Sequence, residues 1–346
     1  MSVSDVLWGE KNSILAAFHM GIVLGMVDTW KRCRGLSTTP QEPDLVAGLV
    51  LEGTPFMYAA LKAILSPYRV AVSFAAAFCH QKPEVTYDPS VKSCELGDLL
   101  FVYVHTPKHG LCRRNALLFQ AKMSAKQPYP IRSTERHQLR LYAEWPDFTY
   151  SRSSFLTGKS RSVNPKAPHA GAQYLLIDDR PPDDPASGLL GFPGTYPVGC
   201  CMPDESLHDH ADLAAELFNL FLFRTGRPFE GRKTAGISDD WSQVVWDLIE
   251  SAVKNSFNRK RSGFRGGPRI SGEYAASADG LSFCCTSSSR SIDTVSEILG
   301  HGDASAFFAP GGDEPPRESE RRSNGWESGA GVSLILIETS ERPIEE

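Results

Sequence analysis

The sequence lacks the motifs of several common enzyme classes. It contains no G-x-S-x-G turn, no H-E-x-x-H pair and no glycine-rich dinucleotide-binding loop. Residues 157–160 (TGKS) end like a phosphate-binding P-loop, but Ser153 stands where that loop requires its first glycine. Residues 208–212 (HDHAD) are similar to a metallo-hydrolase string, yet Leu213 takes the place of the next histidine. These absences argue against the corresponding hydrolase, dehydrogenase and nucleotide-binding classes.

A disulfide framework is also missing. The chain has eight cysteines, but Cys200-Cys201 and Cys284-Cys285 are adjacent pairs and no C-x-x-C occurs. This arrangement favours reduced thiols and a cytoplasmic protein.

Long apolar runs are scarce. Residues 13–27 are apolar apart from His19, which is shorter than a bilayer requires. The preceding residues are not the basic start of an export signal. We therefore expect a buried helix and no membrane span, although Gly21 and Gly25 would also suit close helix packing in a membrane.

The charge of the chain is modest and uneven. A formal net charge of −5 argues against a surface that coats nucleic acid or an anionic membrane. Basic residues nevertheless gather at 108–114, 152–166 and 259–269. This separation suits a local anionic partner.

The order of the expected elements indicates an α/β fold. Helices are expected at 42–52, 56–65 and 134–145, with Thr54 as a helix cap before Pro55, and strands at 70–74, 84–87, 98–105, 116–122 and 173–178. The strands at 98–105 and 116–122 are continuous apolar runs, which favours a central mixed sheet covered by helices on both faces.

The chain divides into three expected regions. These are an N-terminal helix and loop (1–39), the α/β core (40–180) and a helical, loop-rich C-terminal extension (181–346). Within the extension we expect helices at 207–224 and 241–257, and a last strand at 332–337 that could return to a sheet.

Polar residues flank the two strongest strands and suggest a site. Asp98 opens one apolar run, and Gln120-x-Lys122 ends the next. Residues two apart on a strand point to the same face, so Gln120 and Lys122 would project together. If the two strands are neighbours, Asp98 can join them.

This constellation resembles the PD-(D/E)xK, or restriction-endonuclease-like, nuclease superfamily, in its Mrr-like branch with glutamine in the third motif. The resemblance covers roughly residues 42–145 and implies a restriction-endonuclease-like core. It makes Asp98 and Gln120 metal ligands, Lys122 the catalytic lysine, and Glu42 a further metal ligand on the preceding helix. The remaining candidates that it suggests are Glu52 and Glu95 as secondary site residues, and Arg136, Gln138 and Arg140 as phosphate contacts. His80, ahead of the Asp98 strand, is a further secondary candidate from its position alone, and an exposed turn residue is the alternative.

The chemistry explains these residue types. Mg²⁺, or Mn²⁺ in its place, prefers oxygen ligands, polarises a phosphodiester and acidifies bound water. Lys122 would orient that water or offset charge on the phosphoryl oxygens. Gln120 brings no negative charge, so metal would be held more weakly and one ion could replace two. In the plain structural alternative, Asp98 caps a strand, Gln120 satisfies a backbone group and Lys122 extends its amine to solvent at the sheet end.

A basic segment lies outside this core. Arg259, Lys260 and Arg261 lie between Phe257 and Phe264, which is typical of an arm that contacts phosphates and stacks on bases. A solvated loop is the equal alternative.

The expected function is a Mg²⁺-dependent endonuclease that acts on nucleic acid, with DNA favoured over RNA by analogy, in bacterial restriction or antiviral defence. The alternatives are an inactive nucleic-acid-binding scaffold and a protein-interaction module. Pairing with a second copy of the chain or with another protein is left open.

Overall fold

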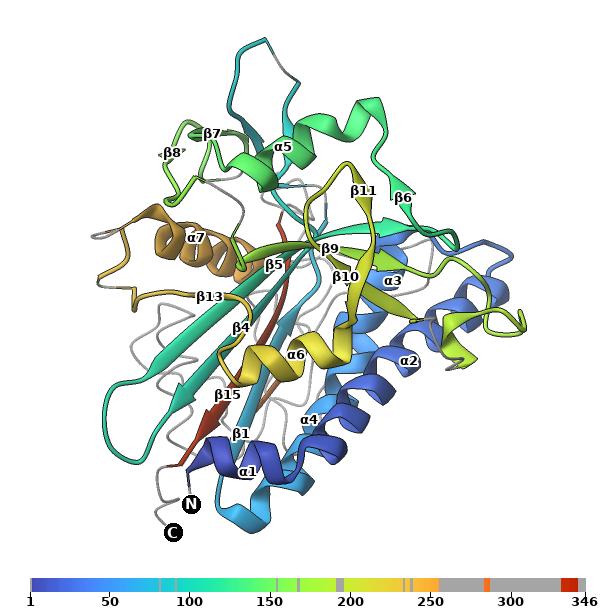
Figure 1. Cartoon of the computed structure of the whole chain (residues 1–346), viewed down its shortest axis with the longest axis vertical. Helices are drawn as coiled ribbons and strands as arrows, with labels where there is room; N and C mark the ends of the chain where they lie inside the picture. The colour runs from blue at the N-terminus through green and yellow to red at the C-terminus, as the bar shows by residue number, and fades with distance from the viewer. Residues whose placement is uncertain are drawn as a thin grey trace, which may run out of the picture.

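A computed structural model describes residues 2–80, 82–90, 92–153, 155–166, 169–190, 196–232, 234–236, 239–254, 283–286 and 331–341. Its centre is a nine-stranded mixed sheet with helices on both faces (Figure 1). Strands follow the order β12-β10-β9-β5-β4-β15-β1-β14, and β13 pairs with β5. The expectation of an α/β protein with a central mixed sheet is confirmed.

The strands of the large sheet have the following bounds: β1 Ala71–Ala77, β4 Leu99–Thr106, β5 Arg113–Met123, β9 Ala172–Ile177, β10 Val198–Cys201, β12 Asp209–Asp212, β13 Arg227–Pro228, β14 Phe283–Thr286 and β15 Ser333–Ser340. A smaller sheet contains β3 Cys94–Glu95, β2 Glu84–Thr86, β7 Phe148–Arg152 and β8 Ser160–Arg161. A third, two-stranded sheet pairs β6 Tyr129–Pro130 with β11 Ser206–Leu207.

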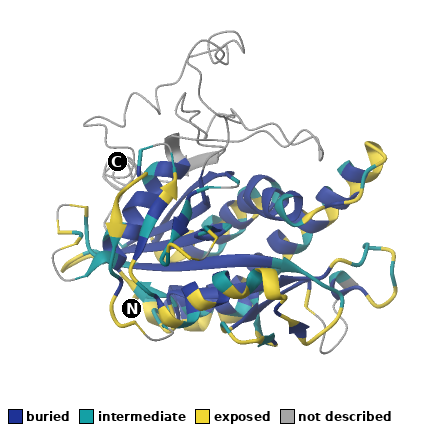
Figure 2. Ribbon diagram, turned by 90° about the horizontal axis from the view of Figure 1, so that it is seen from above, coloured by how far each residue is buried: buried dark blue, intermediate teal, exposed yellow. Residues whose placement is uncertain are grey.

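The helices are α1 Val3–Gly9, α2 Lys11–Gly35, α3 Glu42–Gly48, α4 Thr54–Leu65, α5 Arg136–Glu144, α6 Leu213–Phe221 and α7 Asp240–Lys254. One hydrophobic layer packs the first four helices and α6 on one face of the large sheet. Helices α5 and α7 belong to the layer on the other face. Figure 2 shows buried strands between these layers, with exposed positions on the outer surfaces of the helices.

Both faces of the central strands are buried. In β4, Phe101 and Tyr103 belong to the layer of α2 and α6, whereas Leu100 and Val102 belong to the layer of α5 and α7. Side chains alternate between the faces of a strand, so a strand covered on both sides needs a continuous apolar run. This is the physical reason why residues 98–105 and 116–122 could be recognised from the sequence.

The C-terminal strand β15 lies in the middle of the sheet, between β1 and β4. It runs antiparallel to β1 and parallel to β4, with Ser333 opposite Leu99. A strand from the region 181–346 is therefore hydrogen-bonded on both sides to strands from 40–180. The division of the chain into domains at 39 and 180 stays a prediction.

Two helical expectations were wrong at their boundaries. Thr54 is not a helix cap, because its backbone is helical and a π-helical turn, Leu49–Gly53, joins α3 to α4 without a break. Pro55 has no amide hydrogen to donate, and a wider turn before a proline lets a helix continue past it. The helix expected from Leu207 begins only at Leu213, because residues 209–212 pair with β10 as a strand.

Helix α2 crosses the α3–α4 segment at glycines. A Cβ added to Gly25 would lie 2.8 Å from the carbonyl oxygen of Gly48, and one added to Gly53 would lie 2.7 Å from that of Gly21. The backbones approach closely because neither side carries a side chain there.

The helix expected at 13–27 is longer than predicted, because α2 extends over Lys11–Gly35.

Two helical stretches, Lys11–Gly35 and Glu42–Tyr68, are long and apolar enough to cross a membrane by length and composition. Within the protein, 50% and 72% of their apolar windows are buried. The core helices of soluble proteins meet the same criterion, so these stretches are weak evidence of a membrane span.

Candidate functional site

The register of β4 and β5 places Asp98 beside Gln120. Leu99 is opposite Phe119, so Asp98, one residue earlier, faces Gln120 across the two strands. The Asp98 amide donates to the Phe119 carbonyl at 2.8 Å. The side-chain amide of Gln120 donates to Asp98 Oδ2, and the Ala121 amide donates to the same oxygen at 2.8 Å. Asp98 is therefore fixed by both backbone and side-chain contacts.

Gly97 allows this approach. A Cβ at position 97 would lie 2.7 Å from Leu118 Cδ1 and 2.9 Å from the Tyr142 hydroxyl. That hydroxyl also donates to the Leu96 carbonyl at 2.8 Å. The turn before Asp98 is thus packed against α5, and only glycine fits there without displacement.

Lys122 lies on the same strand face as Gln120 and points toward α5. Its Nζ donates to Gln138 Oε1 at 3.2 Å and lies 3.5 Å from Glu135 Oε1. The side chain is only 12% exposed. Burial alone would lower the pKa of Lys122, but the nearby carboxylates, led by Glu42, raise it overall, so the amine is charged.

Two further acids complete the cluster. Glu42 stands at the start of α3, and burial followed by the charge of Asp98 raises its pKa well above the usual range, against the opposing effect of Lys122. Burial and Asp98, to which it is hydrogen-bonded, raise the pKa of Glu95 to about 8. Burial also raises the pKa of Asp98, while Lys122 opposes that rise. These shared causes mean that the acids and the lysine are electrostatic neighbours.

The cluster carries more acid than base. Four carboxyl groups, from Glu42, Glu95, Asp98 and Glu135, surround the single amine of Lys122. Burial, and after it the like charge of Asp98, disfavours ionisation of Glu95, which is why Glu95 is largely protonated at neutral pH. A divalent cation would relieve this repulsion.

The donor chemistry fits Mg²⁺. The side-chain carbonyl oxygen of Gln120 is buried and has no hydrogen-bond partner, which makes it a neutral oxygen beside the Asp98 carboxylate. Among the described residues, no three His, Cys, Asp or Glu side chains are arranged to hold a metal ion. A magnesium site of one or two carboxylates completed by water needs fewer protein ligands than that.

The other expected site residues lie elsewhere or on the rim. Glu52 pairs with Arg32 at 2.9 Å. Arg136 pairs with Glu205 at 3.3 Å, and Arg140 pairs with Glu144 at 2.8 Å on the exposed side of α5. These ion pairs hold both arginines outside the acid cluster, and their role as phosphate contacts stays a prediction.

The remaining expected residues are His80 and the basic segment. His80 follows β1 at the edge of the sheet where β4 begins, and it is partly buried. The basic residues Arg259, Lys260 and Arg261 fall outside the described residues.

The sequence reading missed Glu135. It lies three residues before Gln138, which is the spacing that puts two side chains on one face of a helix. Its carboxylate accepts from the Tyr129 hydroxyl at 3.1 Å and from the Arg132 amide at 3.0 Å. The i, i+3 relation to Gln138 was the available signal.

Comparisons of the chain with protein-family models, curated proteins and solved structures found no match.

Proposed function

We propose that this chain is a metal-dependent nuclease of PD-(D/E)xK type that hydrolyses phosphodiester bonds in nucleic acid, with DNA favoured. One observation carries the proposal. Asp98 and Gln120 face each other on adjacent strands, with Lys122 two residues further along the same face, and the acids Glu42 and Glu95 are close enough to shift their pKa values. The restriction-endonuclease-like core, and a cytoplasmic role in bacterial restriction or antiviral defence, belong to the same proposal and rest on the resemblance.

Each residue of the cluster would have its own role in this reaction. Asp98 and the side-chain carbonyl of Gln120 would hold Mg²⁺ or Mn²⁺, with Glu42 as a further ligand. The ion supplies Lewis-acid polarisation of the phosphate and a more acidic bound water. Lys122 places a positive charge where negative charge grows on the phosphoryl oxygens.

Gln138 and Glu135 act on Lys122. The side-chain carbonyl of Gln138 accepts from Nζ at 3.2 Å, and Glu135, after Glu42 and Asp98, helps to keep the amine charged. They restrict the amine to one place, so we assign both as positioning residues. Arg136 and Arg140 lie on the neighbouring exposed surface, where they could contact a phosphate backbone only after leaving Glu205 and Glu144.

A second candidate function is an inactive nucleic-acid-binding scaffold. It is favoured by one observation: Asp98 and Lys122 are already satisfied by hydrogen bonds within the protein. Such a network can hold a fold together without performing catalysis.

The test is cleavage of plasmid, linear and single-stranded DNA and of RNA, with Mg²⁺, Mn²⁺ or EDTA. We expect metal-dependent cleavage that falls at least about 100-fold in Asp98→Asn and Lys122→Ala, while nucleic-acid binding survives. Asp179→Asn, a change on an exposed carboxylate outside the acid cluster, is the control and should cleave normally. Binding without cleavage by the unmodified chain in every metal would establish the scaffold instead.

A further inference from the structure

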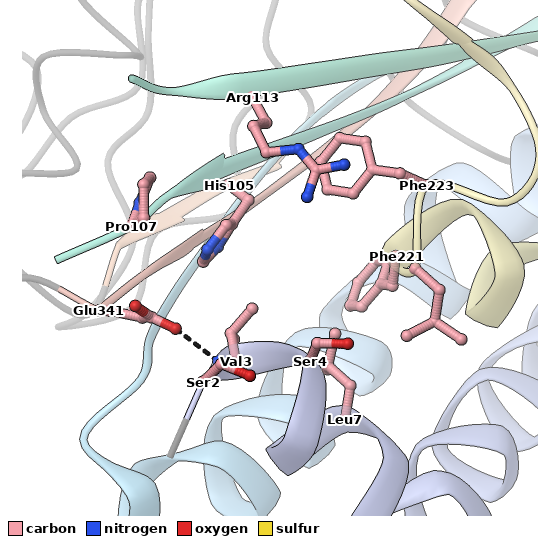
Figure 3. A pocket seen from close by; sticks show the side chains of 11 residues that line it. Ser2, Val3, Ser4, Leu7, His105, Pro107, Arg113, Phe221, Phe223 and Glu341 are labelled. Atoms are coloured by element: carbon pink, nitrogen blue, oxygen red, sulfur yellow. Dashed lines mark hydrogen bonds between the residues drawn. The ribbon is translucent and has the colours of Figure 1, made fainter. Parts of the chain in front are cut away.

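A cavity lies at the opposite end of β4 from the acid cluster. It measures about 220 Å³ and is formed where α1, the end of α6 and the ends of β4 and β15 meet (Figure 3). His105 and Arg113 line it on one side, and Phe221 and Phe223 on another. Asp98 and His105 are seven residues apart on one extended segment, or roughly 23 Å, so the two sites are separate.

Arg113 brings a positive charge to the cavity. Its guanidinium lies 3.9 Å from the centre of the Phe223 ring. Stacking on an aromatic face occupies the flat side of a guanidinium and leaves the N–H groups at its edge free to donate. Among the residues that the structure describes, no carboxylate forms an ion pair with this exposed side chain.

The backbone of Phe223 has a conformation that is unfavourable for a residue with a large side chain. Its φ is 56°, in the left-handed region that glycine commonly occupies at the end of a helix. The Arg224 amide closes the end of α6 by donating to the Asn219 carbonyl at 2.9 Å. A bulky residue is an outlier here. Glycine would terminate α6 with less strain, but it would remove the ring beneath Arg113.

His105 offers a second donor. The fully buried Tyr103 hydroxyl lies 2.7 Å from Thr339 Oγ1, which is 3.0 Å from His105 Nδ1. If the phenol gives its hydrogen to Thr339, the threonine hydroxyl gives its own to Nδ1, and the hydrogen of the neutral ring is then on Nε2. Burial lowers the pKa of His105, which keeps the ring neutral. In Figure 3 the ring points into the cavity.

Glu341 also lines the cavity, but its carboxylate is held by backbone amides and, among the described residues, forms no ion pair with Arg113. Its Oε1 accepts from the Val3 amide at 2.5 Å, and its Oε2 accepts from the Lys108 amide at 3.2 Å. The carboxylate therefore ties the start of α1 to the β4–β5 turn and closes one end of the cavity.

We infer that this cavity binds a small organic anion, a phosphate monoester or a carboxylate carried on a compact apolar or planar group. Arg113 and the Nε2–H of His105 would bind the acidic head, and the rings of Phe221 and Phe223 would contact the body. The volume is below the range of pockets for drug-sized ligands, so the ligand is small.

The test is a titration of the full chain with phenyl phosphate, benzoate and benzyl alcohol, one at a time. Binding is measured by calorimetry or ligand-observed NMR. We expect saturable one-to-one binding of at least one of the two anions and none of the neutral alcohol. The tighter anion identifies the head group. Arg113→Gln should weaken binding at least about tenfold, the loss of one charge-assisted contact.

Three further variants make the result decisive. Phe223→Gly relieves the strain at the end of α6, so it should fold while binding the anion more weakly. Arg69→Gln, which removes an equal charge from an exposed position outside the cavity, should bind normally. Asp98→Asn should also bind the anion normally, because Asp98 lies at the other end of β4. This variant separates the present inference from the nuclease proposal. Absence of saturable binding, equal affinity in Arg113→Gln, or equal binding of benzyl alcohol would overturn the inference.

Discussion

At the scale of single residues, the acid cluster is a site where folding and ionisation oppose each other. A carboxyl group whose pKa is raised on folding binds its proton more tightly in the native state. Glu95 has an ordinary pKa of 4.5 and a pKa of about 8 in the folded protein. The contribution of Glu95 to native stability is therefore fully present below about pH 4.5, and this contribution is lost as the pH rises from about 4.5 to about 8.

Glu95→Gln tests this argument directly. The amide keeps the size of the side chain and cannot ionise, so we expect it to stabilise the protein more at pH 8.5 than at pH 5. The difference in the free energy of unfolding should exceed about 1.4 kcal/mol, the equivalent of one pKa unit. Urea denaturation at both pH values measures it, and Glu144→Gln on the exposed side of α5 serves as the control. An equal effect of Glu95→Gln at both pH values would contradict the raised pKa.

Gly97 is the residue whose size sets the position of Asp98. A methyl group there would meet Leu118 and the Tyr142 hydroxyl. We expect Gly97→Ala to destabilise the protein by about 1–3 kcal/mol, as overpacking does, and to impair cleavage by displacing Asp98. Thermal unfolding and the DNA-cleavage assay report the two effects. Normal stability together with normal cleavage would show that the turn has room that the structure does not indicate.

At the scale of elements, the crossing of α2 over the α3–α4 segment depends on glycine. Gly25→Ala should destabilise the protein by about 1–3 kcal/mol, because the added methyl group would meet the Gly48 carbonyl. Gly35→Ala, in the same helix with open space around it, should instead stabilise by about 0.5–1 kcal/mol. Chemical denaturation of the two variants compares them, and equal effects would contradict the close crossing.

Elements differed in how far the sequence could predict them. The strands β4 and β5 were predictable because burial on both faces leaves a continuous apolar run, and the facing of Asp98 and Gln120 followed from their pairing. The start of α6 was not predictable, because residues 209–212 become a strand only through pairing with β10. The π turn before Pro55 was equally hidden, since a proline after threonine reads locally as a helix start.

The partners of individual side chains were the hardest feature to predict from the sequence. Gln138 was expected to contact phosphate, which stays a prediction, and its hydrogen bond from Lys122 was not foreseen. The ion pairs of Arg136 and Arg140 join residues that only the fold or a helical turn brings together. Charge and spacing in a sequence do not determine which of several nearby partners a long side chain takes.

At the scale of the whole molecule, residues 333–340, from the C-terminal region, are part of the sheet that holds the site. Strand β15 hydrogen-bonds to β1 and β4, and the Ser333 amide donates to the Asp98 carbonyl at 3.0 Å. Removal of residues 331–346 should therefore prevent cooperative folding, and with it cleavage. Circular dichroism and thermal unfolding of the truncated chain test this, with removal of residues 342–346 alone as the control. A truncated chain that unfolds as cooperatively as the full one would show that β15 is dispensable.

The central claim is that Asp98, Gln120 and their acidic neighbours bind a divalent cation. The most direct measurement is a titration of the metal-free chain with Mn²⁺, followed by electron paramagnetic resonance, at pH 6.5 and pH 7.5. Glu42, the further proposed ligand, and Glu95 beside it have raised pKa values and must lose their protons when the ion binds. We therefore expect the affinity to rise by up to about tenfold for each proton released between these pH values, and to be lost in Asp98→Asn. Affinity that is independent of pH and unchanged in Asp98→Asn, or no binding at either pH, would contradict the account.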